Sequence, residues 1–117
     1  MENADLVLHL GGPGTSPFPD LAAALRVARN ARAELPEARV ELVVQGPVVS
    51  QLAGSGPAAA EAGALASESG TKVTACRNSL RSAGIDETSL PAGITVVPAA
   101  VAHLAQRQFA GAAYIRI

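Results

Sequence analysis

The segment RVELVVQGP, residues 39–47, decides the fold. Its apolar positions are mostly β-branched valines and it ends at Gly-Pro, which is the pattern of a short buried strand followed by a turn. We therefore predict a strand at residues 39–45. Other apolar runs bounded by turn residues predict four further strands, at residues 5–10, 71–76, 94–97 and 112–117.

Stretches with helical spacing separate these strands. In the first of them, Leu21, Ala24, Leu25 and Ala28 recur at intervals of three and four residues, and Pro36 ends the pattern, so an amphipathic helix is expected. Proline and glycine residues mark the boundaries of three more helices. The four predicted helices cover residues 20–35, 57–69, 77–83 and 98–109, with one further helical turn at residues 48–53.

The alternation of strands and helices determines the predicted architecture. Crossover connections between successive strands make neighbouring strands parallel, and a parallel sheet is covered by helices on both faces. The sequence thus predicts an α/β fold, a three-layer sandwich with about five strands in a mostly parallel sheet. Residues 1–117 are enough for one domain of this kind.

The side-chain pattern also predicts which residues point inward. Lys72 and Thr74 alternate with apolar residues, so one face of their strand should be less buried. On the last helix, one stripe is expected to face the sheet and contains Val101, Leu104, Ala105 and Gln108 or Phe109. Another stripe is expected to face solvent or a neighbouring subunit and contains His103, Gln106 and Arg107.

Composition and charge argue against several classes of protein. Of the 117 residues, 49% are hydrophobic but only 3% aromatic, so the core must consist of Ala, Val, Leu and Ile. A net charge of −1 without a basic run disfavours nucleic-acid binding. The sequence has no apolar run near the ~18 residues of a membrane span, and its N-terminal segment lacks the basic residues of a signal peptide. We therefore expect a cytoplasmic protein whose single cysteine stays reduced.

The carboxyl ends of the predicted strands form the expected site, because ligands of open parallel sheets bind there. Cys76 ends the third strand where a helix begins, and the backbone N–H groups of a helix N-terminus stabilise a thiolate. The adjacent Arg77 could add positive charge. Asn78 and Ser79 follow, either as helix caps or as hydrogen-bond donors to a ligand. The opposite interpretation is a buried Cys76 that acts only as a small hydrophobic residue.

Two other strands bring polar groups to the same edge. Gln45 and Gly46 end the second strand and are expected to line the binding site. His9 lies near the end of the first strand, where an imidazole can act as an acid or base or can be a half-buried, hydrogen-bonded residue. If the first and third strands are neighbours, His9 and Cys76 can form a pair. No cofactor is expected, and no metal site, since the two histidines and the cysteine lack metal-ligand spacing.

Three segments carry a resemblance to a known family: RVELVVQGPVV at residues 39–49, ACRNSLRSAGI at 75–85 and LPAGITVVPAAVAHLAQRQFAGAAYIRI at 90–117. In combination they resemble small members of the DsrE/DsrF-like family, from the second predicted strand to the end of the chain. The resemblance implies an α/β fold, assembly as a homotrimer or homohexamer, and a cysteine that carries sulfane sulfur as a persulfide. That cysteine corresponds to Cys76, followed by Asn78 and Ser79.

Two functions of different classes are expected. The first is a DsrE-like sulfur-relay protein in which Cys76 forms the persulfide, His9 shuttles a proton, and other proteins donate and accept the sulfur. Its ligand-binding residues would be Arg77, Asn78, Ser79, Gln45 and Gly46. The second is a non-catalytic oligomeric module that binds a small ligand or assembles with other proteins, with Cys76 packed in its wall. The exposure of the Cys76 sulfur separates the two.

Two further expectations concern the loop after the first strand and the surface. The loop GGPGTS, residues 11–16, is a third candidate site, for a small anion or a nucleotide, although it lacks the known phosphate-loop patterns. Only 16% of the residues are charged and the mean hydropathy is +0.26. So small a domain then exposes much apolar surface, and such surface usually marks an interface, which favours a homo-oligomer.

Overall fold

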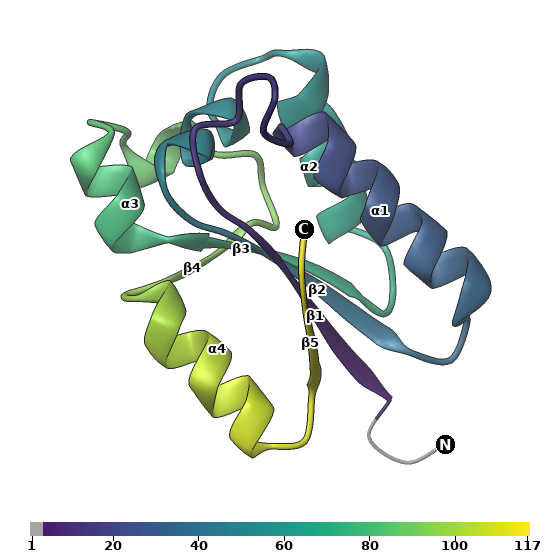
Figure 1. Ribbon diagram of the computed structural model, residues 1–117. Helices are drawn as coiled ribbons and strands as arrows, with labels where there is room; N and C mark the ends of the chain where they lie inside the picture. Colours follow the sequence, from purple (N-terminus) through teal and green to yellow (C-terminus); the bar gives the residue numbers. More distant parts are fainter. Residues whose placement is uncertain (1–3) are drawn as a thin grey trace.

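Five parallel strands form the sheet of this protein, in the order β4-β3-β2-β1-β5 (Figure 1). The computed structural model describes residues 4–117. The strands are β1 (Asp5–Leu10), β2 (Arg39–Val44), β3 (Thr71–Cys76), β4 (Thr95–Val97) and β5 (Ala113–Arg116). The predicted α/β fold is confirmed, and every strand pair is parallel.

Helices cover both faces of the sheet. They are α1 (Leu21–Glu34), α2 (Pro57–Ala66), α3 (Arg77–Ser82) and α4 (Ala100–Phe109), with the short 3₁₀ helices η1 (Pro47–Leu52) and η2 (Glu87–Ser89). Figure 1 shows α1 and α2 on one face and α4 on the other, which gives the three predicted layers. Two helices are shorter than predicted, since α2 ends at Ala66 and α4 begins at Ala100. The sequence pattern predicts no element at η2.

Local sequence explains where the helices begin. Asp20 accepts a hydrogen bond from the Ala23 N–H at 2.8 Å and so caps α1. Pro57 occupies the start of α2, where a missing N–H costs nothing. Helix α3 needs no loop, because Cys76 is both the last residue of β3 and the N-cap of α3. The cysteine is therefore fixed where a strand turns directly into a helix.

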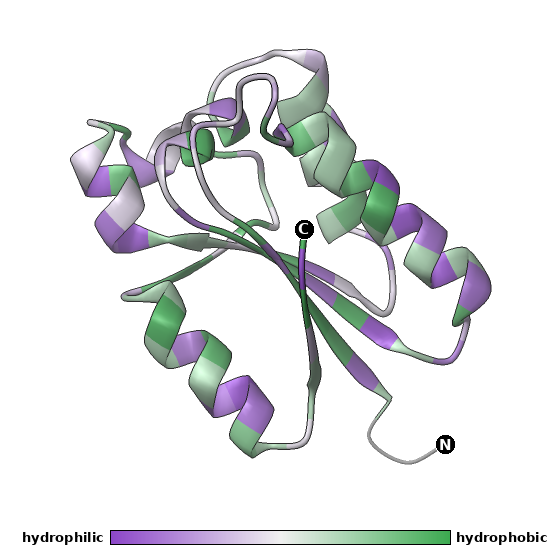
Figure 2. Ribbon diagram, viewed as in Figure 1, coloured by the Kyte–Doolittle hydropathy of each residue, from purple (hydrophilic) through white to green (hydrophobic). Residues whose placement is uncertain are grey.

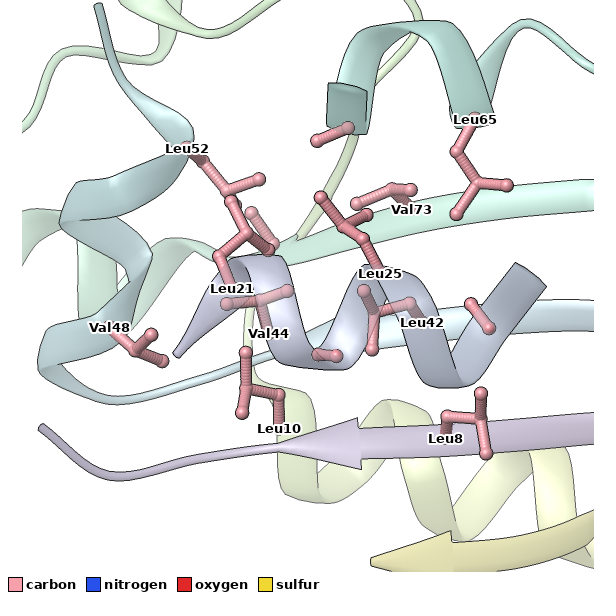
Figure 3. Packing of buried hydrophobic residues seen from close by; sticks show 14 of the residues in the cluster. Leu8, Leu10, Leu21, Leu25, Leu42, Val44, Val48, Leu52, Leu65 and Val73 are labelled. Atoms are coloured by element: carbon pink, nitrogen blue, oxygen red, sulfur yellow. The ribbon is translucent and has the colours of Figure 1, made fainter. Parts of the chain in front are cut away.

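The larger core lies between the sheet and helices α1 and α2. Figure 3 shows Leu21 and Leu25 of α1 beside Leu42 and Val44 of β2 and Leu10 of β1. The same cluster also contains Leu8, Val48, Leu52, Leu65 and Val73. Burying one such leucine contributes about 1.5–3 kcal/mol relative to leaving it exposed. Figure 2 shows the central strands as largely hydrophobic. The face of the sheet under α1 and α2 accounts for most of the buried apolar side chains.

The face under α4 is smaller and partly polar. Its apolar cluster consists of Val7, Val43, Cys76, Ala100 and Leu104. Four polar residues are buried in the structure, namely Asp5, His9, Glu41 and Thr74. The prediction of a less buried face on β3 holds for the exposed Lys72 but is wrong at Thr74, which is 0% exposed. The Thr74 hydroxyl donates to the Glu41 carboxylate at 2.5 Å, so its polar group is satisfied inside the protein.

Helix α4 faces the sheet with a different stripe from the predicted one. Leu104 is buried and Ala105 half-buried, but Val101 is 68% exposed and Phe109 is 87% exposed. Gln106 is exposed, as predicted. The inward position expected for Val101 and Phe109 is therefore wrong in the single chain.

The prediction that His103 and Arg107 face solvent is also wrong. His103 Nε2 lies 2.7 Å from Glu41 Oε2, and Arg107 Nε donates to Glu41 Oε1 at 3.1 Å. The Glu41 side chain is only 5% exposed, and a buried carboxylate needs such partners. The polar stripe of α4 therefore turns inward to pair with a glutamate in the middle of β2.

Within residues 4–117, none of the helices combines the length and the apolar character that a membrane span requires.

Candidate functional site

A pocket of about 660 Å³ opens at the carboxyl edge of the sheet, beside the ends of β2 and β3. Helix α3 and the start of α4 form its other walls. The lining residues are Gln45, Gly46, Pro47, Cys76, Asn78, Ser79, Ser82, Ala83, Ala99, Ala100 and Val101. Five of the residues predicted for the site thus meet at one cavity: Gln45, Gly46, Cys76, Asn78 and Ser79.

Two opposing effects act on the pKa of the Cys76 thiol. Burial raises the pKa of the thiol, because a thiolate loses hydration there. The Ser79 hydroxyl and the backbone N–H groups of Ser79, Ala100 and Asn78 have the opposite effect, and together they hold the pKa of Cys76 below its ordinary value. The donors belong to the starts of both α3 and α4. The site therefore stabilises a negative charge on sulfur without a cation.

The backbone N–H of Gly46 orients the Ser79 hydroxyl. The Gly46 N–H donates to Ser79 Oγ at 2.8 Å, which leaves the hydroxyl hydrogen to point toward the sulfur. Gly46 has a φ of 80°, a left-handed conformation that favours glycine, and a Cβ at this position would lie 3.1 Å from the Gly12 nitrogen. The Gly-Pro after β2 thus serves the site by presenting a backbone donor.

Arg77 does not contribute positive charge to the pocket. Its guanidinium Nε lies 2.6 Å from Glu87 Oε2 in η2, and Arg77 is not among the lining residues. The proposed help from Arg77 to the thiolate is therefore not seen. None of the residues that line the pocket carries a charged side chain.

His9 and Cys76 do not form a direct pair. Strand β2 lies between β1 and β3, so the condition for that pairing is not met. Both ring nitrogens of His9 have other partners: Nδ1 lies 2.7 Å from the Tyr114 hydroxyl, and Nε2 lies 2.8 Å from Gln45 Oε1. Burial lowers the pKa of His9; the Gln45 hydrogen bond opposes this effect, and the positive charge of Arg116 adds to it.

Some groups at the site escape prediction from the sequence. Ala100 packs beside Cys76 from the start of α4, more than twenty residues further along the chain, and its N–H lowers the pKa of the thiol. Pro98, two residues before the helix, was the only signal of a helix start there. Tyr114 reaches His9 from the edge strand β5, and no residue pattern connects the two positions.

The glycine-rich loop after β1 lies apart from the pocket wall. Gln51 of η1 holds it: Gln51 Nε2 donates to the Gly14 carbonyl at 2.9 Å, and Gln51 Oε1 accepts from the Leu21 N–H at 2.8 Å. No residue of this loop lines the cavity at Cys76. Elsewhere in the described part of the chain, no group of three or more His, Cys, Asp and Glu side chains is placed to hold a metal ion.

The all-parallel sheet in the order 4-3-2-1-5, with a cysteine where β3 becomes a helix, defines an α/β protein with the DsrE/DsrF-like fold. The chain is similar along 97% of its length to the protein of unknown function MTH1491 from Methanobacterium thermoautotrophicum, with 29% identity, a TM-score of 0.82 and 98% of that chain covered. It also matches the ychN protein from E. coli over 97% of its length and 98% of that chain, with 18% identity and a TM-score of 0.70.

Sequence comparisons add no further relatives, since no protein-family model and no curated protein matches the chain. The resemblance to the DsrE/DsrF-like family is therefore supported at the level of the fold, across nearly the whole chain.

Proposed function

We propose that this protein is a sulfur carrier that holds sulfane sulfur as a persulfide on Cys76. The observation that supports this proposal is the position of Cys76, which lines a pocket where β3 turns into α3, beside N–H and O–H groups that lower the pKa of its thiol. A thiolate is the nucleophile in such chemistry, and donors that favour the thiolate raise the reactive fraction at neutral pH. The DsrE/DsrF-like fold agrees with the same function.

The first step is a transfer between two thiol groups. The Cys76 thiolate attacks the outer sulfur of a donor persulfide, R–S–SH. A new bond forms between Cys76 Sγ and that sulfur, the S–S bond of the donor breaks, and R–S⁻ leaves with its electron pair. The hydrogen stays on the transferred sulfur. The products are Cys76–S–SH and a donor thiolate, so no external oxidant or reductant is needed.

The second step returns the cysteine to its starting state. An acceptor thiolate attacks the outer sulfur, and Cys76 leaves as a thiolate. A leaving thiol with a lowered pKa departs faster, so the donors from Ser79, Asn78 and Ala100 serve this step as well as the first. The chain has only one cysteine, so the donor and the acceptor are other molecules, which we propose are partner proteins.

The experiment is incubation with a small persulfide donor, followed by intact mass measurement. The expected result is a gain of one sulfur atom, reversed by excess thiol and absent from Cys76→Ser. The Ser82→Ala variant is the matched control, because Ser82 lines the same pocket but makes no hydrogen bond to the sulfur in the structure. No mass gain in the wild-type protein, or a gain that persists in Cys76→Ser, would refute the carrier function.

A second function has an observation in its favour. Cys76 is only 2% exposed, so the exposed sulfur that was expected of a carrier is not seen in the single chain. The residue packs in a cluster with Val43, Ala100 and Leu104, as expected for a wall residue of a non-catalytic binding or assembly module. Titration with a thiol reagent separates the two functions. Labelling of the native protein on the time scale of a free thiol supports the carrier, whereas labelling only after unfolding supports the module.

We also propose that the protein assembles with itself, as a homotrimer or homohexamer. Four large apolar side chains on α4 and β5 are exposed in the single chain, and they are Val101, Phe109, Tyr114 and Ile115. Strand β5 is also an edge of the sheet, with unpaired backbone groups on its outer side. Sedimentation of the protein at micromolar concentration tests this, and a monomer would contradict it.

A further inference from the structure

The side chains of Tyr114, His9 and Gln45 form a continuous chain of hydrogen bonds that ends at the Cys76 pocket. We propose that Tyr114 and His9 are positioning residues that fix the Gln45 carboxamide with its N–H group, and not its oxygen, toward the pocket. This inference deepens the proposed function because it concerns the same site, but its test needs no sulfur transfer.

The direction of each hydrogen bond follows from the chemistry of the groups. Gln45 Oε1 can only accept, so the hydrogen between it and His9, 2.8 Å apart, belongs to His9 Nε2. A neutral imidazole then has a bare Nδ1, which accepts from the Tyr114 hydroxyl at 2.7 Å. His9 is 8% exposed and faces the positive charge of Arg116, and both conditions oppose a second proton on the ring.

The free end of the Gln45 amide is its nitrogen. Gln45 Nε2 has no hydrogen-bond partner among residues 4–117. Yet, over this range, every fully buried side-chain nitrogen or oxygen has a partner. The Nε2 group is therefore accessible rather than buried, and Gln45 lines the pocket at Cys76.

The strand register brings Gln45 and Cys76 to the same place. Val44, the last residue of β2, lies opposite Ala75 of β3, and the next residues along the chain are Gln45 and Cys76. Residues in register on parallel strands point to the same face, so the two side chains leave the sheet together under the start of α4. An amide N–H there favours a thiolate or persulfide anion, whereas an amide oxygen would repel it.

Tyr114 determines which way the amide lies. Its ring centroid is 5.7 Å from that of His9, held by the pairing of Tyr114 with Val7 across β1 and β5. Without the hydroxyl, His9 Nδ1 has no donor and can take the hydrogen itself. Nε2 then becomes an acceptor, and Gln45 satisfies it by turning its N–H inward and its oxygen toward the pocket.

The test is Tyr114→Phe, which removes one oxygen and keeps the ring. Cys76 alkylation rates are measured across pH with neutral iodoacetamide and anionic iodoacetate. In Tyr114→Phe we expect the rate of alkylation by iodoacetate to fall by about fivefold relative to the rate with iodoacetamide. This factor corresponds to one ordinary hydrogen bond. On a Gln45→Leu background, Tyr114→Phe should have no further effect, because the relay acts through Gln45. An unchanged reagent ratio, or an equal effect on the Gln45→Leu background, overturns the proposal.

Ring ¹⁵N NMR of His9 in the wild-type protein gives a second measurement that does not depend on any variant. The Nε2–H tautomer is expected, and an Nδ1–H tautomer overturns the proposal even if Tyr114→Phe fails to fold. If Cys76 carries no sulfur but His9 is the Nε2–H tautomer and the reagent ratio changes, the carrier function fails and the relay stands. If sulfur loads normally but the tautomer is Nδ1–H, the relay fails and the carrier function stands.

Discussion

Replacing Ser79 with alanine removes a side-chain hydroxyl that lowers the pKa of Cys76. In the native structure the Ser79 hydroxyl accepts from the Gly46 N–H at 2.8 Å, which leaves its own hydrogen free to stabilise the thiolate, and it lowers the pKa of Cys76. The variant keeps the three backbone donors, because they depend on α3 and α4 and not on the serine side chain. Ser79→Ala therefore isolates one hydrogen bond to the thiolate.

The expected magnitude follows from that bond. A hydrogen bond to a charged group is worth about 1.5–3 kcal/mol, which shifts the thiol–thiolate equilibrium about 13- to 160-fold toward the thiol. The pKa of Cys76 thus rises in the variant. The remaining thiolate is a better nucleophile, with a Brønsted coefficient of about 0.4–0.5, so roughly half of the logarithmic loss is recovered. The alkylation rate at neutral pH should fall by about 3- to 13-fold.

The assay is the pH dependence of iodoacetamide alkylation, with intact mass as the readout. Ser82→Ala controls for loss of a hydroxyl in the same pocket, and Ser79→Thr keeps the donor and should keep most of the rate. The reasoning is refuted if Ser79→Ala has the wild-type pH profile, or if Ser82→Ala changes the rate equally. Ser79→Ala should also lower the free energy of unfolding by about 1 kcal/mol, because the Gly46 N–H loses its acceptor.

Three other perturbations test different parts of the structure. Glu41→Gln should lower the free energy of unfolding by about 3 kcal/mol in urea denaturation, because the half-buried His103 and Arg107 lose their carboxylate partner; Glu87→Gln, which breaks an exposed pair, should change it by less than about 1 kcal/mol. Because the pKa of His9 is lowered in the folded protein, the unfolded chain takes up the histidine proton at a higher pH than the folded chain does. The free energy of unfolding should therefore fall as the pH drops through about 6.5, and His9→Gln should reduce that loss in thermal melts. Phe109→Ser should shift sedimentation toward the monomer, and unchanged assembly would place the interface elsewhere.

The fold was predictable because its strands carry a strong local signal. β1 and β2 are almost continuous apolar runs, and such runs are buried on both faces in a parallel sheet. Which side of α4 faces the sheet was not predictable from the sequence of that helix alone. Periodicity favours burying Val101 and Phe109, but His103 and Arg107 turn inward because Glu41 is buried opposite them. A glutamate between Val40 and Leu42 was the signal for this arrangement.

The site was predictable as a set of strand ends, but its internal contacts were not. All parallel strands end at the same edge, so the sequence places Gln45, Gly46, Cys76 and Ser79 along one edge, and they meet there because β2 and β3 are neighbours. Whether His9 touches Cys76 depends on that order, which short-range patterns do not encode. The direction of Arg77 depends on Glu87, ten residues away in the unpredicted helix η2.

Helix α4 connects the two polar regions of the second face. The helix pairs with β2 through His103, Arg107 and the buried Glu41, while its first N–H, from Ala100, lowers the pKa of Cys76. Few apolar side chains hold this helix, so its position depends heavily on the polar contacts. A buried ion pair contributes little net stability compared with apolar packing, but it has strict geometry. The cluster at Glu41 therefore helps to fix the position of α4, and with it the position of the Ala100 N–H beside Cys76.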